Sequence, residues 1–309
     1  MMMFVQVFWL PKEGNTTEEY EDAVAYSISE RRFAVTDGAT ESSFAERWAQ
    51  SLVRGFVFGE VPHWEGEAPA EPIDKFGRSL TLPVPIDKFR SLTLSALKNW
   101  LAPLQREWRE GIDWKRLPWF AVEKAQAGAF ASLLGLEFVG CSAGASPSHS
   151  AGASPSLSSS ETPATESLRW RAIAIGDSCL FQVRNDALFR AFPLDRAEQF
   201  GNRPLLLSSN PVNNQRVWDE VQFDEGDCQI DDIFFLVTDA LAHWFLVQHE
   251  AGAKPWATLC DLNTQEDFDS LIVHLRQERL IRNDDVTLII IHLDCNALSS
   301  GQRNYEEKQ

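Results

Sequence analysis

Phe33-Ala-Val-Thr-Asp37-Gly38 is the stretch that decides the fold, because a short apolar run ends there in an aspartate and a glycine. Apolar runs of this length, rich in β-branched and aromatic residues, are typical of strands covered on both faces. A carboxylate at the end of such a strand is unfavourable to desolvate unless a cation meets it. The neighbouring glycine lets its own carbonyl approach an ion closely. Asp-Gly is also a common turn, so by itself the stretch also fits a strand that ends in a turn before a helix.

The pattern of a buried strand with an acidic end recurs three times. The stretches are Ile173-Ala-Ile-Gly-Asp177-Ser178, Ile233-Phe-Phe-Leu-Val-Thr-Asp239-Ala240 and Asn283-Asp284-Asp285-Val-Thr-Leu-Ile-Ile-Ile-His292. Asp177 also fits a turn at the start of a hairpin, whereas Asp239 needs a cation or a helix N-terminus. The adjacent charges of Asp284 and Asp285 are best tolerated beside a metal. If these strand ends converge, they form an oxygen-ligand site for Mg²⁺ or Mn²⁺.

Other chemical motifs are weak or missing. A further acidic run, Glu18-Glu-Tyr-Glu21-Asp22, opens a predicted strand, but such runs are usually solvated loops. The histidines show no spacing typical of a zinc site, and Ser178 does not lie in a nucleophile elbow. The chain has no glycine-rich phosphate loop. The sequence therefore indicates a carboxylate metal site before any other kind of site.

The composition limits the partners. The chain has 309 residues and a formal net charge of -17, from 28 Lys and Arg against 45 Asp and Glu. Such an acidic surface argues against nucleic acid and anionic membranes as partners. The five cysteines are scattered without metal-binding spacing, which favours reduced thiols. The apolar start, Met1 to Leu10, is too short to span a membrane and lacks a basic flank, so we expect a first strand and a cytoplasmic protein.

Two segments interrupt the globular pattern of what we expect to be a single domain over residues 1–309. Within 61–95, Ile73–Leu82 recurs as Ile86–Leu94 with one glycine missing. This deletion would turn every later side chain of a strand to the other face, so the copies cannot pack equivalently. Within 141–167, Ser-Ala-Gly-Ala-Ser-Pro-Ser occurs twice and offers little apolar surface to offset the entropy of ordering. We expect both segments to be poorly ordered insertions that the chemistry does not need.

The rest of the chain predicts sequential strands with helices before and after them. The predicted strands are 3–10, 22–27, 32–36, 129–136, 169–175, 179–184, 233–238 and 286–292, and the predicted helices follow 40–43 and span 94–110 and 268–279. Thr and Ser at 40–43 are expected to cap the first helix. The alternating strand–helix order of a parallel sheet is missing, which favours antiparallel sheets covered by helices, an α+β fold.

Taken in order, the acidic stretches resemble the metal-dependent protein phosphatases, the type 2C serine/threonine phosphatases. The resemblance runs from about Pro11 to Leu293, outside the two insertions, and is carried by Glu21-Asp22-Ala23, Val35-Thr-Asp37-Gly38, Gly176-Asp177-Ser178, Leu236-Val-Thr-Asp239 and Asp284-Asp285-Val-Thr287. Each motif is short, but five in this order are a specific signal. The resemblance implies a four-layer α/β/β/α sandwich of two mainly antiparallel sheets, with two Mg²⁺ or Mn²⁺ ions at one end.

The resemblance also implies roles for single residues. Asp37 would bridge both ions, and the carbonyl of Gly38 would bind one of them. Asp239 and Asp284 would complete the coordination of the other ion. Asp37, Asp239 and Asp284 are therefore the expected catalytic residues. A water activated between the ions would attack phosphorus in line.

Three further metal-site residues follow from the same resemblance. Glu21 and Asp22 would hold metal-bound waters. Asp177 would lie nearby and serve a third, weaker metal.

The chain departs from the family pattern at four positions. The family's phosphate-binding arginine is replaced by Thr17, and Lys12 and Arg32 are the two candidates to substitute for it. The other departures are Ala39, where many eukaryotic members have histidine, Ala240, where most relatives have glycine, and His243, where an acidic residue is common.

Three functions stay open at this point. The leading hypothesis is a phosphomonoester hydrolase that removes phosphate from phosphoserine or phosphothreonine in proteins or peptides. The alternative is a catalytically weak or inactive relative that uses the same fold as a metal-binding interaction module, which the change at Thr17 favours. A third possibility is a hydrolase of a small phosphorylated molecule. Three buried carboxylates without a metal would be strongly unfavourable, so each reading includes metal binding.

Overall fold

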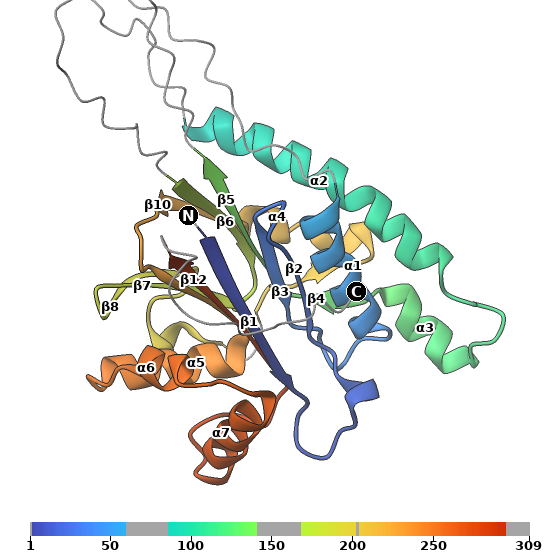
Figure 1. Cartoon of the computed structure of the whole chain (residues 1–309). Helices are drawn as coiled ribbons and strands as arrows, with labels where there is room; N and C mark the ends of the chain where they lie inside the picture. The colour runs from blue at the N-terminus through green and yellow to red at the C-terminus, as the bar shows by residue number, and fades with distance from the viewer. Residues whose placement is uncertain (1, 60–85, 141–167, 202–203, 295–309) are drawn as a thin grey trace, which may run out of the picture.

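The computed structural model describes residues 2–59, 86–140, 168–201 and 204–294. Two five-stranded sheets form its centre (Figure 1). The first contains, in spatial order, β1 (Met2–Leu10), β12 (Val286–Asp294), β11 (Ile233–Val237), β7 (Cys179–Arg184) and β8 (Ala187–Phe192). The second contains β10 (Gln222–Asp227), β6 (Leu168–Ile175), β5 (Leu133–Gly140), β3 (Arg32–Thr36) and β2 (Ala23–Ser27). A small sheet pairs β4 (Phe130–Ala131) with β9 (Leu207–Ser208).

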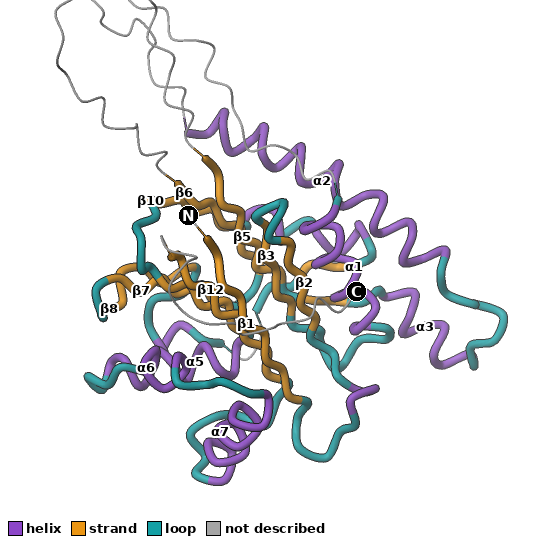
Figure 2. The backbone as a smooth tube through the Cα atoms, viewed as in Figure 1, coloured by secondary structure: helices purple, strands orange, loops and turns teal. Residues whose placement is uncertain are grey.

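Helices cover the outer face of each large sheet (Figure 2). The helices are α1 (Ala45–Phe58), α2 (Ile86–Glu110), α3 (Trp119–Ala127), α4 (Val217–Glu220), α5 (Asp239–Glu250), α6 (Pro255–Cys260) and α7 (Gln265–Gln277), with short turns η1 (Thr17–Glu19), η2 (Ala197–Gln199) and η3 (Pro211–Asn214). Side chains of α1 and α2 pack on the second sheet, and those of α5, α6 and α7 pack on the first. A third apolar cluster fills the space between the sheets. The predicted α+β fold with four layers, α/β/β/α, is confirmed.

Helix α1 shows how the sequence pattern produces this packing. Trp48, Leu52 and Phe56 recur at helical spacing and are fully or almost fully buried against the second sheet. The ring of Phe56 lies over Gly135 of β5, where an added Cβ atom would stand 2.5 Å from the ring carbons. The glycine therefore makes room for the aromatic side chain and brings α1 close to the sheet.

The antiparallel pairing gathers strand ends at one edge of the sandwich. Thr36 at the end of β3 pairs with Ala23 at the start of β2. Val237 at the end of β11 pairs with Cys179 at the start of β7 and with Leu288 near the start of β12. In antiparallel neighbours, the end of one strand lies beside the start of the next. The segments that carry the acidic motifs are therefore brought to one end of the molecule.

The structure differs from the sequence expectations in three local features. Helix α1 begins after Phe44, which adopts a left-handed φ of 61°, and no Ser or Thr side chain caps it. Helix α2 begins at Ile86, ahead of the predicted start at Leu94, so the second copy of the repeat is helical. The predicted strand 129–136 is divided at Ser132 into β4 and β5. The predicted caps at 40–43 are therefore wrong, because the αL backbone at Phe44 sets the entry into the helix instead.

The two predicted insertions fall largely on residues that the structure does not describe. Residues 60–85 and 141–167, which hold most of the two expected insertions, lie outside the described residues. The turn between β7 and β8 contains Asn185 and Asp186, whose left-handed φ values of 51° and 58° suit a tight hairpin. Among the described helices, none combines the length and the apolar character needed to cross a bilayer.

Candidate metal centre

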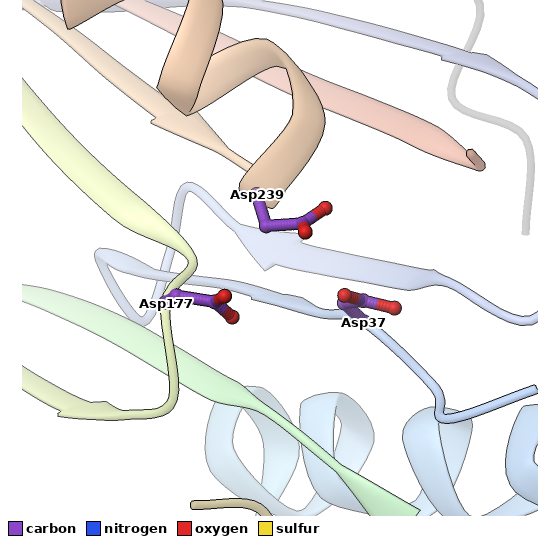
Figure 3. Close-up of side chains that lie close together, drawn as sticks. All are labelled: Asp37, Asp177 and Asp239. Carbon is purple, nitrogen blue, oxygen red and sulfur yellow. The ribbon is translucent and has the colours of Figure 1, made fainter. Parts of the chain in front are cut away.

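Three aspartates from separate loops meet at the acidic end of the sandwich (Figure 3). Asp37 follows β3, Asp177 lies in the turn between β6 and β7, and Asp239 is the first residue of α5 directly after β11. One carboxylate oxygen of each lies within 4.8 Å of the others. Because these loops belong to both large sheets, the cluster bridges the two halves of the sandwich.

Buried oxygen atoms without hydrogen-bond partners accompany this cluster. In the described part of the chain they are Oε2 of Glu21 and Oδ1 of Asp22, Asp177 and Asp239. Of these residues, Asp22 is 2% exposed, Asp177 is 4% exposed and Asp239 is 6% exposed. Since buried polar atoms in native proteins are almost always paired, these oxygens indicate that cations complete the site.

The pKa values of the aspartates reflect the same crowding. Burial, followed by the charges of neighbouring aspartates, raises the pKa of Asp37 well above its usual value. Burial also raises the pKa of Asp22 and of Asp239. For Asp177, burial and the charge of Asp239 raise the pKa to about 7. A divalent cation among these groups would favour their ionised forms and offset the mutual repulsion.

Asp284 and Glu21 lie at the edge of the cluster. The charge of Asp284 acts on Asp37, Asp177 and Asp239, which places it nearby, but it does not belong to the group within 4.8 Å. Its Oδ1 accepts a hydrogen bond of 3.0 Å from the next backbone N–H. Oε2 of Glu21 faces the ammonium group of Lys12 at 3.6 Å. Of the six predicted carboxylates, the structure thus brings Asp37, Asp177 and Asp239 into one tight group and leaves Glu21, Asp22 and Asp284 outside it.

Residue 38 must be a glycine because the backbone of Glu21 approaches it too closely to leave room for a side chain. A Cβ atom at this position would stand 2.5 Å from the carbonyl oxygen of Glu21 and 3.3 Å from Cβ of Ala45. Gly38 also forms an isolated bridge with Ala131 of β4. The glycine therefore lets the Asp37 segment, the Glu21 segment and the start of α1 pack together at the site.

Two serines hold the Asp37 and Asp177 loops in register. Oγ of Ser132 accepts a hydrogen bond of 2.8 Å from the backbone N–H of Asp37, and the Ser132 N–H donates to the Asp37 carbonyl, also at 2.8 Å. The same hydroxyl lies 2.8 Å from the hydroxyl of Ser178, next to Asp177. The sequence pattern gives no sign that Ser132 belongs to the site, because the break between β4 and β5 is not visible in it.

Asp22 is oriented by a short chain of hydroxyl groups. Thr287 donates a hydrogen bond of 2.7 Å to Oδ2 of Asp22 and is itself bonded to the Tyr20 hydroxyl. With Asp22 ionised, the Thr287 proton points to the carboxylate, so the Tyr20 hydroxyl donates to Thr287. These contacts leave Oδ1 of Asp22 as the oxygen without a partner.

Asp285 ties two strand ends together. Its Oδ1 accepts a hydrogen bond of 2.8 Å from the backbone N–H of Lys12, and its Oδ2 accepts one of 2.7 Å from the N–H of Glu21. Asp285 is 4% exposed, and both of its oxygens are used within the protein. Its neighbour Asp284 is therefore the residue of this pair that is free to face the cluster.

The two predicted substitutes for the family's arginine lie in different places. Arg32 donates to Glu137 at 3.0 Å and to the carbonyl of Gly59 at 3.1 Å. It begins β3 whereas Asp37 follows it, and five residues of strand span about 17 Å. Lys12 lies at the acidic end, where it faces Glu21 and donates to Thr40 at 3.2 Å. Arg32 is therefore too distant to serve the cluster, and Lys12 lies beside it.

A further positively charged residue, Arg282, lies directly beside the cluster, although no sequence motif pointed to it. Arg282 forms an ion pair with Oδ2 of Asp239. Its position two residues before Asp284 was the only available signal.

The donor set fits a hard divalent cation. The groups that converge are carboxylate oxygens, with the carbonyl-bearing Gly38 segment beside them, and such ligands suit Mg²⁺ and Mn²⁺. Asp37, Asp177 and Asp239 are the residues that would hold a first ion, each offering one oxygen. No group of three potential metal ligands elsewhere in the described residues meets the same distance limit.

Solved structures of known proteins share this architecture. The serine/threonine phosphatase PstP/Ppp of Mycobacterium tuberculosis matches 96% of this chain and 100% of its own, with a TM-score of 0.53 and 15% identity. A bacterial serine phosphatase matches 96% of this chain and 100% of its own, with a TM-score of 0.52 and 12% identity. No family model matches the sequence, and no curated protein matches it. The likeness confirms the fold that the motifs predicted, and the chain has the fold of the metal-dependent, PPM-type serine/threonine phosphatases.

Proposed function

We propose that this protein is a metal-dependent phosphomonoester hydrolase that acts on phosphoserine or phosphothreonine in proteins or peptides. The observation that carries the proposal is the convergence of Asp37, Asp177 and Asp239 with buried, unpaired carboxylate oxygens around them. The shared fold with a serine/threonine phosphatase and a bacterial serine phosphatase supports the same activity.

The residues of the site divide into metal ligands and groups that orient them. Asp37, Asp239 and Asp284 are the residues on which turnover is proposed to depend, and Asp177 adds a further ligand. Mg²⁺ or Mn²⁺ at this site would lower the pKa of a coordinated water and stabilise the charge that develops on phosphorus. The Ser132 hydroxyl accepts a hydrogen bond from the backbone N–H of Asp37. This bond holds the Asp37 carboxylate in position, so that it does not need to be reorganised during the reaction.

Glu21 and Asp22 are proposed to hold water at the edge of the site. Thr287 occupies Oδ2 of Asp22, and its Oδ1 remains buried and unpaired. A carboxylate held by one oxygen in this way can accept a hydrogen bond from water with the other. The role is a proposal drawn from the family resemblance and supported by this contact.

The test is hydrolysis of p-nitrophenyl phosphate and of a phosphothreonine peptide with Mn²⁺ or Mg²⁺, with and without EDTA. We expect metal-dependent turnover that Asp37→Asn and Asp239→Asn reduce by on the order of 10²- to 10³-fold, as removal of other charge-stabilising groups does. Asp113→Asn is a matched control, since Asp113 is a 60% exposed side chain paired only with Arg116 within its own loop.

The competing functions give different results in the same experiment. An interaction module without catalysis would bind Mn²⁺ in calorimetry but show no turnover of either substrate. A hydrolase of small molecules would cleave p-nitrophenyl phosphate and leave the phosphopeptide intact. Unchanged turnover in both aspartate variants would contradict the assigned site.

A further inference from the structure

Arg282 is a cation at the acidic end that the metal site does not explain. Its guanidinium contacts Oδ2 of Asp239, while Oδ1 of the same carboxylate is buried without a partner. The Arg282 side chain is 47% exposed, whereas that of Asp239 is 8% exposed. The arginine therefore reaches from solvent onto the outer oxygen of a carboxylate whose other oxygen lies inside the protein.

Two arginines elsewhere in the described residues, Arg184 and Arg32, use their donors differently. Arg184 makes a two-point contact with Asp232, at 2.8 and 2.7 Å, and its side chain is 12% exposed. Arg32 is also 12% exposed and bonds both Glu137 and a backbone carbonyl. The guanidinium groups of these two arginines are hydrogen-bonded to groups of the protein itself. Among the described residues, Asp239 is the only hydrogen-bond acceptor found for Arg282, so the other N–H donors of this half-exposed side chain have no partner there.

Those free donors suit a phosphate group. A guanidinium presents planar N–H pairs that match phosphate oxygens, and such charge-assisted hydrogen bonds are among the stronger ones in proteins. A phosphate monoester dianion that approaches a cluster of carboxylates needs positive charge along its path, and bound ions would supply only part of it. Thr17 offers no charge, and Lys12 is already directed to Glu21 and Thr40. Arg282 is thus the cation best placed to meet the substrate.

We infer that Arg282 binds the phosphate group of the substrate, with Asp239 holding its guanidinium at the mouth of the site. This inference rests on the proposed phosphatase function and gives the chain a phosphate-binding arginine on the segment before β12. Asp239 then has two roles, since one oxygen faces the metal cluster and the other orients the arginine.

The test compares Arg282→Gln, Arg282→Lys and Arg279→Gln in the full chain. We expect Arg282→Gln to raise KM and the inhibition constant of inorganic phosphate by about 10-fold or more, as loss of a charged hydrogen bond does. Arg282→Lys should lie between this variant and the unmodified protein, since an ammonium keeps the charge but not the paired donors. Arg279→Gln removes the same charge from an exposed position in the preceding turn and should leave both constants unchanged.

A second readout separates phosphate binding from a purely structural pairing with Asp239. Mn²⁺ affinity, measured by calorimetry, should remain within about threefold in Arg282→Gln or become tighter, since the variant frees an oxygen of Asp239. If the only change is tighter Mn²⁺ binding, with the phosphate constants unaltered, Arg282 merely neutralises Asp239 and the inference is wrong. It is also wrong if Lys12→Gln, and not Arg282→Gln, weakens phosphate binding.

Failure of the proposed function would be recognised separately. A chain without metal-dependent turnover would overturn the phosphatase proposal alone. Inorganic phosphate would then be titrated calorimetrically into the Mg²⁺-loaded protein and into Mg²⁺-loaded Arg282→Gln. Weaker binding to the variant would support Arg282 as a phosphate ligand, and equal binding would overturn it.

Discussion

At the scale of single residues, Ser132 links the Asp37 loop to the Asp177 loop, although we propose no role for its side chain in substrate binding. Its hydroxyl accepts from the backbone of Asp37 and lies 2.8 Å from the hydroxyl of Ser178. It is fully buried, so a change here leaves polar groups without water as an alternative partner. The geometry of two proposed metal ligands in different loops therefore depends on a hydroxyl that neither loop contributes.

Ser132→Ala is expected to weaken Mn²⁺ binding by about 10- to 100-fold, the range found when groups that orient metal ligands are removed. It should also lower the free energy of unfolding by about 1–3 kcal/mol, because the Asp37 N–H loses its buried acceptor. Calorimetric Mn²⁺ titration and urea unfolding measure the two effects. Ser51→Ala is the control, since within the described residues that hydroxyl bonds only the Arg47 carbonyl of α1, and the change should alter stability by less than about 0.5 kcal/mol.

At the scale of elements, the packing of three segments at Gly38 decides how close the strand ends come. The carbonyl of Glu21, which precedes β2, lies where a Cβ atom on residue 38 would stand. Because the obstacle is backbone rather than a flexible side chain, an added methyl group must displace β2, β3 or the start of α1. The site thus depends on the absence of a side chain as much as on its carboxylates.

Gly38→Ala is expected to destabilise the fold by about 1–3 kcal/mol, as overpacking of a closely packed region does. Turnover and Mn²⁺ affinity should fall with it, since the Glu21 and Asp37 segments separate. Thermal unfolding and calorimetry of the variant would be compared with Gly140→Ala, where, among the described residues, the new Cβ would meet only the Arg31 side chain at 3.6 Å. Equal effects of the two substitutions would show that the close approach at Gly38 does not matter.

At the scale of the whole molecule, the buried carboxylates link stability to pH and to metal. Burial raises the pKa of Asp177 from 3.8 to about 7, and burial also raises the pKa of Asp22, Asp37 and Asp239. A carboxyl group whose pKa is higher in the folded than in the unfolded state stabilises the fold at low pH. This stabilisation is lost as pH rises through the folded pKa. For Asp177 alone the difference corresponds to about 4 kcal/mol at most.

The EDTA-treated protein should therefore lose thermal stability between pH 5 and pH 8. Mn²⁺ should raise the Tm more at pH 8 than at pH 5, because the ion takes the place of the protons among the carboxylates. Thermal unfolding at four pH values, with EDTA or with Mn²⁺, measures this. Asp177→Asn should show a smaller loss with EDTA than Asp113→Asn, and identical pH profiles for the two variants would argue against a buried, protonated Asp177.

The sequence by itself determined most of the strands, their antiparallel arrangement and the carboxylates at the strand ends. These features are local, because burial of an apolar run and the length of a turn are set by neighbouring residues. Asp37, Asp177 and Asp239 were identifiable for this reason, since each follows a buried strand. The proposed roles of Glu21, Asp22 and Asp284 came from the resemblance and remain predictions.

Only the tertiary structure decided which distant groups support these carboxylates. Ser132 reaches Asp37 across 95 positions of sequence, and Thr287 reaches Asp22 across 265. Neither pairing leaves a trace in periodicity or composition, because each depends on which strands become neighbours in the sheets. The same holds for Arg282, since only the folded chain places its guanidinium group on Asp239. A hydrogen bond is specific in distance and direction, so its partners are fixed only when the sheets have assembled.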